Sequence, residues 1–259
     1  MASEDDDRVD RWRVPEVDGL AEEGGRTRLR HLTEGAELKV EDGRLRRGAG
    51  YADASRGARR ALARVGAMVR LRQLGRYLVH ASGVVDPRGR AWIFAGRSGS
   101  GKSTLAYALA RSGWQVLGDD GVLIERDGEE LVARAWRDPL LVSSRLAAHF
   151  PEIGAGPECE IPGDARQRLP VRAPAARAAP VAALLLVRHT PRDEITRLPA
   201  AQALASLIRL SPWVALDDAF ARDHFAAMQQ LARSVPVFSF EHSERQLRLV
   251  SQTLSELLP

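Results

Sequence analysis

Residues His80–Val122 read HASGVVDPRGRAWIFAGRSGSGKSTLAYALARSGWQVLGDDGV, and this stretch decides the fold. Within it, Gly96–Thr104 (GRSGSGKST) matches the phosphate-binding pattern G-x-x-x-x-G-K-[ST] in full. A short apolar run at 91–95 precedes this loop, and an apolar-periodic stretch at 102–111, closed by Gly113, follows it. These flanks predict a buried strand before the loop and a helix after it, which is the context that such a loop requires.

The residue types of this loop suit a nucleoside triphosphate and Mg²⁺. Glycines let backbone N–H groups point inward around phosphate oxygens, and the following helix adds its positive N-terminal end. Lys102, one of only two lysines in the chain, would reach the β- and γ-phosphates, and the Ser103 hydroxyl would coordinate Mg²⁺. A glycine-rich turn without a ligand is the alternative. We predict a site for ATP and Mg²⁺ made by Gly96, Ser98, Gly99, Ser100, Gly101, Lys102, Ser103 and Thr104.

Two adjacent acids, Asp119 and Asp120, follow the next apolar stretch, WQVLG at 114–118. A strand–helix–strand crossover from the loop would return the chain beside the loop at this point. Adjacent carboxylates repel one another unless a cation lies near, so Mg²⁺ is a natural partner. Phosphoryl transfer to an alcohol also needs a carboxylate that accepts the hydroxyl proton. The pair therefore predicts metal binding and catalysis, and an acidic turn is the alternative.

The chain divides into three predicted parts. Residues 1–25 are charged and lack periodicity, which predicts a disordered tail. Residues 26–75 predict a small N-terminal hairpin, turning at Asp42-Gly43, and a helix that begins after Ser55 and runs to about Leu74. Residues 76–259 are expected to form an α/β catalytic domain.

Further elements of that domain follow from periodicity and turn residues. We predict a strand at 79–85, a hairpin at 121–136, a buried strand at 181–187, helices at 199–210 and 217–233, a strand at 235–241 and a last helix from Ser243 to about Leu258. Residues 150–180 have weak periodicity and predict a long loop region.

Composition narrows the class of protein. The chain has 259 residues and a single cysteine, Cys159, which excludes an intramolecular disulfide. It has no apolar run of membrane-spanning length, and its acidic N-terminus lacks the apolar core of a secretory signal, so we expect a cytoplasmic location. The net charge is +4, but nearly all of the basic residues are arginines scattered among acids. We therefore expect neither a nucleic-acid nor a membrane partner. The histidines other than His80 lack metal-ligand spacing and are interpreted as structural: His31, His149, His189, His224 and His242.

The stretch His80–Val122 resembles the core of bacterial HPr kinase/phosphorylase, and it also resembles the nucleotide site of phosphoenolpyruvate carboxykinase, which shares that P-loop fold. The shared features are a histidine that opens a strand, the P-loop, a glycine that ends the helix and an Asp-Asp pair after an apolar strand. The resemblance implies a P-loop sheet with flanking helices. It also implies that Asp120 accepts the proton of a substrate serine, and that Asp119 supports the metal or orients its partner. His80 matches the family's active-site histidine, and a structural strand histidine is the alternative.

The sequence also departs from that family. The loop reads Lys-Ser-Thr where HPr kinases usually have Lys-Ser-Glu, and only about 75 residues precede the core, where the family has a large N-terminal domain. The nearest likeness to the family's second metal-binding glutamate is Glu152, and its phosphate-contacting arginine would correspond to Arg172 or Arg177; an ordinary surface charge is the alternative for each. These departures put HPr itself in doubt as the substrate.

The leading hypothesis is an ATP- and Mg²⁺-dependent kinase that phosphorylates a serine or similar hydroxyl of a peptide or small protein. Compact HPr-kinase-like proteins phosphorylate other targets, including precursor peptides of ribosomally made natural products such as lasso peptides. Two alternatives stay open: a kinase for a small-molecule alcohol, and a nucleotide-binding regulatory or assembly protein without phosphotransfer. Homo-oligomer formation is also left open.

Overall fold

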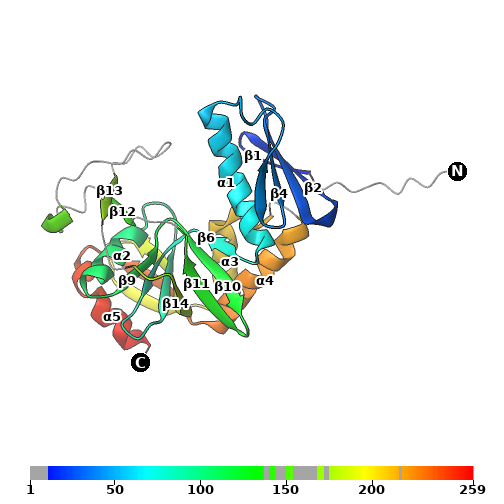
Figure 1. The fold of residues 1–259 in the computed structure, drawn as a ribbon. Coiled ribbons are helices and arrows are strands. Elements are labelled where there is room, and N and C mark those ends of the chain that lie inside the picture. The colour runs from blue at the N-terminus through cyan, green and yellow to red at the C-terminus, as the bar shows by residue number, and fades with distance from the viewer. Residues whose placement is uncertain are drawn as a thin grey trace. The chain divides into compact units, whose positions relative to one another are not determined.

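The computed structural model describes residues 11–136, 140–143, 150–153, 168–171, 175–215 and 218–258 (Figure 1). It divides the chain into two compact units, Met1–Tyr77 with Pro212–Ala226, and Leu78–Ser211 with Ala227–Pro259. Each unit has its own sheet and its own apolar core. The fold is mixed α/β.

The first unit contains an antiparallel sheet of five described strands in chain order. These are β1 (Arg11–Val14), β2 (Val17–Glu22), β3 (Arg26–His31), β4 (Glu37–Glu41) and β5 (Arg44–Arg47), with the 3-10 turn η1 (Glu23–Gly25) after β2. The helix α1 (Arg56–Gln73) packs on this sheet. Alternate strand residues face the helix, as period-two patterning requires. The resulting core contains Val17, Leu29, Leu38, Val40, Ala58, Leu62 and Val69.

The predicted hairpin and helix of this unit are confirmed. Asp42 and Gly43 both have positive φ, 49° and 66°, which is the backbone of the tight turn that joins twisted antiparallel strands. The Ser55 hydroxyl accepts a hydrogen bond of 3.1 Å from the backbone N–H of Ala58 and so caps α1.

The predicted disorder of residues 1–25 is wrong for residues 11–25, where β1 and β2 extend the hairpin to five strands. β2 pairs with β3 along its whole length, from Val17 opposite His31 to Glu22 opposite Arg26. Its acids lie on the face away from the core, while Val17 is fully buried. The outward acids conceal the short alternating pattern in the sequence. Residues 1–10 lie outside the described part of the chain.

A buried arginine joins α1 to the second segment of this unit. Arg72 is 5% exposed, and its guanidinium donates to the backbone carbonyls of Trp213 and Val214 and to Nδ1 of His224. A buried charge must be paired or hydrogen-bonded. The hydrogen bonds of Arg72 meet this requirement and connect α1 to residues 213–224 of the same unit.

Nine described strands form the sheet of the second unit, in the order β6-β10-β11-β14-β8-β7-β9, with β16 paired to β14 and β15 paired to β16. Their bounds are β6 (Tyr77–Val79), β7 (Ala81–Val85), β8 (Ala91–Ala95), β9 (Gln115–Gly118), β10 (Val122–Asp127), β11 (Glu130–Ala135), β14 (Ala178–His189), β15 (Glu194–Arg197) and β16 (Val237–His242). β8 and β16 run parallel to β14, on opposite sides of it. β7 runs antiparallel to both β8 and β9, between them.

Helices and short elements complete the chain. They are α2 (Lys102–Arg111), α3 (Ala200–Leu210), α4 (Asp218–Ser234), α5 (Val250–Leu257), the 3-10 turns η3 (Pro151–Ile153), η4 (Pro212–Ala215) and η5 (Arg245–Arg248), and a small sheet of β12 (Leu140–Ser143) and β13 (Arg168–Val171). The last predicted helix is thus divided into η5 and α5. Within the described residues, no helix is both long and apolar enough to cross a membrane.

Most elements predicted for this unit are confirmed, including β8, α2 and the hairpin of β10 and β11. The predicted strand at 79–85 is interrupted at His80, which lies between β6 and β7. The region 150–180, predicted as a loop, contains β13 and the start of β14, and its residues 154–167 and 172–174 lie outside the described part.

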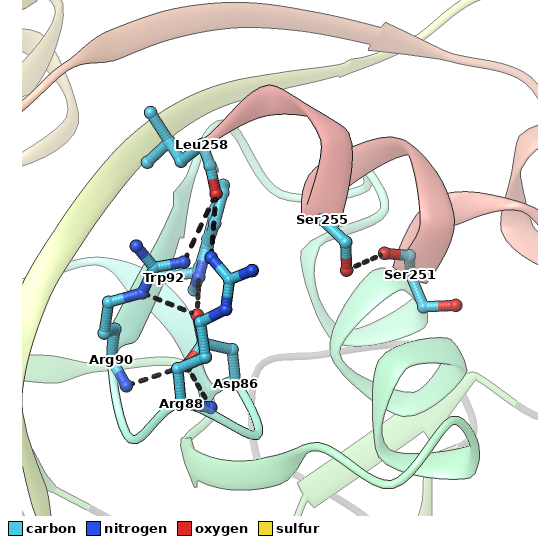
Figure 2. A network of polar contacts seen from close by, with 7 residues as sticks. All are labelled: Asp86, Arg88, Arg90, Trp92, Ser251, Ser255 and Leu258. Carbon is cyan, nitrogen blue, oxygen red and sulfur yellow. Dashed lines mark hydrogen bonds and ion pairs between the residues drawn. The ribbon is translucent and has the colours of Figure 1, made fainter.

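The turn between β7 and β8 is organised by one buried carboxylate, Asp86 (Figure 2). Its two oxygens accept hydrogen bonds from the backbone N–H groups of Arg88 and Arg90, from the Arg90 guanidinium and from the Trp92 indole, all between 2.9 and 3.0 Å. Burial raises the pKa of Asp86, but these hydrogen bonds and the Arg90 charge outweigh burial and hold the pKa below its usual 3.8. Arg88 and Arg90 also reach the backbone carbonyl of Leu258.

Asp86→Asn is expected to lower the free energy of unfolding by about 1–3 kcal/mol at pH 7, because buried donors lose a charged acceptor. The folded-state pKa of Asp86 is depressed, so its contribution is present above pH 4 and is lost as the pH falls through the folded pKa. The difference between wild type and variant in urea denaturation should therefore shrink below pH 4. Asp127→Asn, at the exposed turn between β10 and β11, is the control and should change stability little at either pH. A difference that persists unchanged at pH 3 would contradict the assignment.

Candidate functional site

The loop of residues 96–101 joins β8 to α2 and curls tightly. Gly99 and Gly101 have φ of 83° and 94°, a conformation that side chains strongly disfavour. A side chain at Gly96 would meet the Ser100 hydroxyl at 2.6 Å and the carbonyl oxygen of Val187 at 2.7 Å. Glycine is therefore required at the first position because β14 passes directly beside it.

Lys102 is buried, and its ammonium group is directed back over the loop. Its Nζ donates to the carbonyl oxygens of Gly96 at 2.8 Å and Arg97 at 3.2 Å, and lies 3.3 Å from Nε2 of His80. The Lys102 ammonium is thus held at the start of α2, where the helix dipole is also positive.

Asp119 lies at the end of β9, next to the loop. Its Oδ1 accepts hydrogen bonds from the hydroxyls of Ser103, at 2.8 Å, and Ser82, at 2.5 Å. The pairing of Gly83 in β7 with Gly118 in β9 explains this contact, because it brings the ends of the two strands together. The two residues predicted to hold a metal, Ser103 and Asp119, are in direct contact.

Asp120 differs from its neighbour in exposure and in backbone. It is exposed, whereas Asp119 is 5% exposed, and its φ of 59° is unusual for a residue other than glycine. The next residue is Gly121, where a side chain would meet Trp136 at 2.6 Å and Leu78 at 2.9 Å. Such strained non-glycine backbone is concentrated at functional sites, where surrounding packing maintains it.

His80 connects Lys102 with Asp120. Burial lowers the pKa of His80 below its usual 6.5, and the Lys102 charge lowers it further, against the opposing effects of the Asp120 charge and a hydrogen bond to the Asp120 backbone. The ring is therefore neutral at pH 7, and its Nε2 can accept a hydrogen bond from Lys102.

His242, which was interpreted as an ordinary structural histidine, lies against the loop. It ends β16, is 1% exposed, and its Nε2 is 3.0 Å from the carbonyl oxygen of Ser100. A side chain at Gly101 would stand 2.5 Å from this same nitrogen. Burial lowers the pKa of His242, so the neutral ring can donate from Nε2 to the carbonyl. Its place at the end of an apolar strand was the only sequence signal.

The other predicted residues have simpler surroundings. Ser98 and Gly99 are exposed at the tip of the loop, Ser100 is half-buried, and Thr104 is half-buried in the first turn of α2. Arg177 is exposed beside the start of β14, and Glu152 lies in the short turn η3. Arg172, Cys159 and His149 lie outside the described residues.

Comparisons with known proteins show distant similarity to HPr kinase/phosphorylase. The chain is 35% identical over 81 residues to the enzyme of Pelodictyon phaeoclathratiforme, which is 31% of this chain and 23% of that protein. It is 39% identical over 70 residues to the enzyme of Chlorobium limicola, which is 27% of this chain and 19% of that protein. The chain thus matches about a quarter or less of these relatives' length. No family model matches.

Among solved structures, the HPr(Ser) kinase/phosphatase from Coxiella burnetii matches 70% of this chain and 94% of its own chain, with a TM-score of 0.35 and 14% identity. The resemblance stated from sequence is confirmed as a distant similarity by the sequence matches.

Gly101→Ala is expected to lower the free energy of unfolding by about 2–5 kcal/mol, because left-handed strain of about 1–2 kcal/mol adds to overpacking of about 1–3 kcal/mol against His242. In a His242→Ala background the overpacking disappears, and only the strain should remain. Urea denaturation of the four proteins of this double-mutant cycle measures the coupling.

Gly99→Ala is the matched control, since Gly99 also has positive φ but has nothing within 4 Å of the added carbon. It should show strain alone in both backgrounds. An equal effect of Gly101→Ala with and without His242 would disprove the contact.

Proposed function

We propose that this chain is an ATP- and Mg²⁺-dependent kinase that transfers the γ-phosphate to a serine or similar hydroxyl of a peptide or small protein, including a natural-product precursor peptide. The P-loop arrangement would then be that of HPr kinase and of the nucleotide site of phosphoenolpyruvate carboxykinase. The similarity to HPr kinase/phosphorylase supports the class of reaction.

The observation that carries this proposal is the 2.8 Å contact between Ser103 and Asp119 beside the glycine loop. A hydroxyl and a carboxylate are the hard oxygen ligands that Mg²⁺ prefers, and Mg²⁺ bound to a nucleotide needs few of them because it retains water and binds phosphate oxygens. In the described parts of the chain, no group of three or more His, Cys, Asp or Glu side chains is arranged to hold a metal ion by itself. The donor set thus fits Mg²⁺ that arrives with the nucleotide.

Each loop residue then has a defined task. The backbone N–H groups of residues 96–101 and the Lys102 ammonium hold the phosphate oxygens, and Ser103 and Asp119 hold Mg²⁺. When bound, Mg²⁺ neutralises charge on the β- and γ-phosphates. Lys102 would exchange its contacts with the Gly96 and Arg97 carbonyls for phosphate oxygens.

Asp120 is the proposed proton acceptor. The substrate hydroxyl oxygen forms a bond to the γ-phosphorus, the bond from that phosphorus to the β-phosphate oxygen breaks, ADP leaves, and the hydroxyl proton passes to the Asp120 carboxylate. Its exposure suits contact with a substrate, whereas buried Asp119 suits the metal. His80 is a positioning residue, because it contacts Lys102 and the Asp120 backbone together.

Asp120→Asn is expected to keep nucleotide affinity within about twofold but to lower turnover by about 100-fold or more, the usual effect of losing a general base. The measurement is mass spectrometry of serine-containing candidate peptides after incubation with ATP and Mg²⁺, alongside titration with nucleotide. Asp127→Asn is the control for loss of an exposed acid in the same unit and should retain turnover.

Three outcomes separate the alternatives. Turnover retained in Asp120→Asn would remove the assigned base. Phosphorylation of a small alcohol but of no peptide would favour the small-molecule kinase. Nucleotide binding without transfer to either class of acceptor would favour a regulatory or assembly protein.

A further inference from the structure

The arginines of the first unit are concentrated, contrary to the scattered distribution expected from the whole sequence. The chain has 38 basic and 34 acidic residues, yet residues 43–77 contain ten arginines and one acid, Asp53. A general preference for arginine would raise the number of arginines along the whole chain, but it would not lower the number of acids in one segment. This segment comprises β5, the following turn and α1.

Some of these arginines have structural partners. Arg70 donates to the carbonyl of Gly43 at 2.6 Å, and Arg72 is buried in the unit. The exposed ones are Arg44, Arg46, Arg47, Arg56, Arg59, Arg60, Arg64 and Arg70.

Three of the exposed arginines line a single cavity of about 420 Å³. Its lining residues are Arg47, Tyr51, Ala52, Arg59 and Arg60, without a carboxylate among them. The Arg47 guanidinium lies over the Tyr51 ring, 5.7 Å from its centroid, and the Arg59 guanidinium donates to the Ala52 carbonyl at 3.0 Å. These contacts orient two guanidiniums, each of which has five N–H donors.

The clustered positive charges of this cavity destabilise the protein when no ligand is bound. Guanidiniums that converge on one cavity repel one another, and Arg59 and Arg60 lie near the N-terminal end of α1, where the helix dipole favours anions. Glu34 accepts two hydrogen bonds from Ser55, and its charge also acts on Arg59. Asp53 follows the lining residue Ala52 in the chain, but two carboxylates, Glu34 and Asp53, do not balance three arginines, so the cavity stays positive.

We propose that this cavity binds the carboxylate side chains of an acidic peptide segment. Arginine matches carboxylates with paired, parallel hydrogen bonds, and three guanidiniums with no acid in the lining suit two neighbouring Asp or Glu residues. A single-stranded nucleic acid fits less well, because the Tyr51 face is covered by Arg47 and does not offer a base-stacking surface.

The neighbouring sheet surface supports a peptide over a polynucleotide. On this sheet, acids of β2 and β4 pair with arginines of β3 and β5, as in the Arg28–Glu22 and Arg46–Glu41 ion pairs. A continuous phosphate backbone would meet these acids, whereas a short acidic segment needs only the cavity. The claim that this cavity binds an acidic peptide is independent of the proposed function. The claim that the peptide is the kinase substrate rests on the proposed function.

The test uses the full chain without nucleotide and a labelled short peptide rich in Asp and Glu, followed by fluorescence anisotropy. Arg60→Gln, which keeps a good helix former, is expected to weaken binding about tenfold, as loss of a charge-assisted pair does. Arg64→Gln, one turn further along α1 and outside the cavity lining, removes the same charge and should weaken binding less than about twofold. Arg60→Gln should leave the unfolding temperature unchanged or raised.

Equal weakening by Arg64→Gln and Arg60→Gln would overturn the proposal in favour of general electrostatic attraction. Tighter, Arg60-dependent binding of a single-stranded DNA of equal charge would overturn it in favour of nucleic acid, and absence of peptide binding would also overturn it. In the kinase reaction, Arg60→Gln should raise the KM for an acidic serine peptide and leave kcat unchanged. Loss of all transfer with binding intact would instead count against the proposed function alone.

Discussion

The close approach of two strands to the glycine loop is the constraint on which the site depends. β14 presents the Val187 carbonyl to Gly96, and β16 presents the His242 ring to Gly101. These two contacts limit one side of the glycine loop. The loop leads into α2, which begins at Lys102, and Ser103 in its first turn faces Asp119. The same two contacts explain why Gly96 and Gly101 lack room for a side chain, whether or not the loop binds a phosphate.

Local patterns predicted local structure well. The all-apolar run of β8, the periodicity of α2 and the Asp42-Gly43 turn depend on residues within a few positions of one another, and all appear in the structure. The second hairpin turns one residue later than predicted, at Gly128-Glu129, because Asp127 still pairs with Glu130. The contact between Ser103 and Asp119 was also expected, because a helix that packs back on its sheet must return the next strand to the same edge.

Features that depend on distant pairing were not predictable in this way. Nothing in the sequence of β7 indicates that it runs antiparallel between β8 and β9, or that Ser82 on it contacts Asp119. His242 reaches the loop only because β16 pairs with β14 far along the chain. In β2, outward acids concealed a strand whose inward residues are few. Strand order and register are settled by packing over the whole sheet, which a local pattern does not encode.

The position of β7 has an evolutionary consequence. Because this strand runs opposite to its neighbours, the beginning of β7, with Ser82 on it and His80 just before it, meets the ends of β8 and β9. Nearly all side chains of the candidate site therefore come from one short continuous segment, 80–120. Such a segment can pass between unrelated surroundings as a cassette, provided that the host supplies two strands to support the glycine loop.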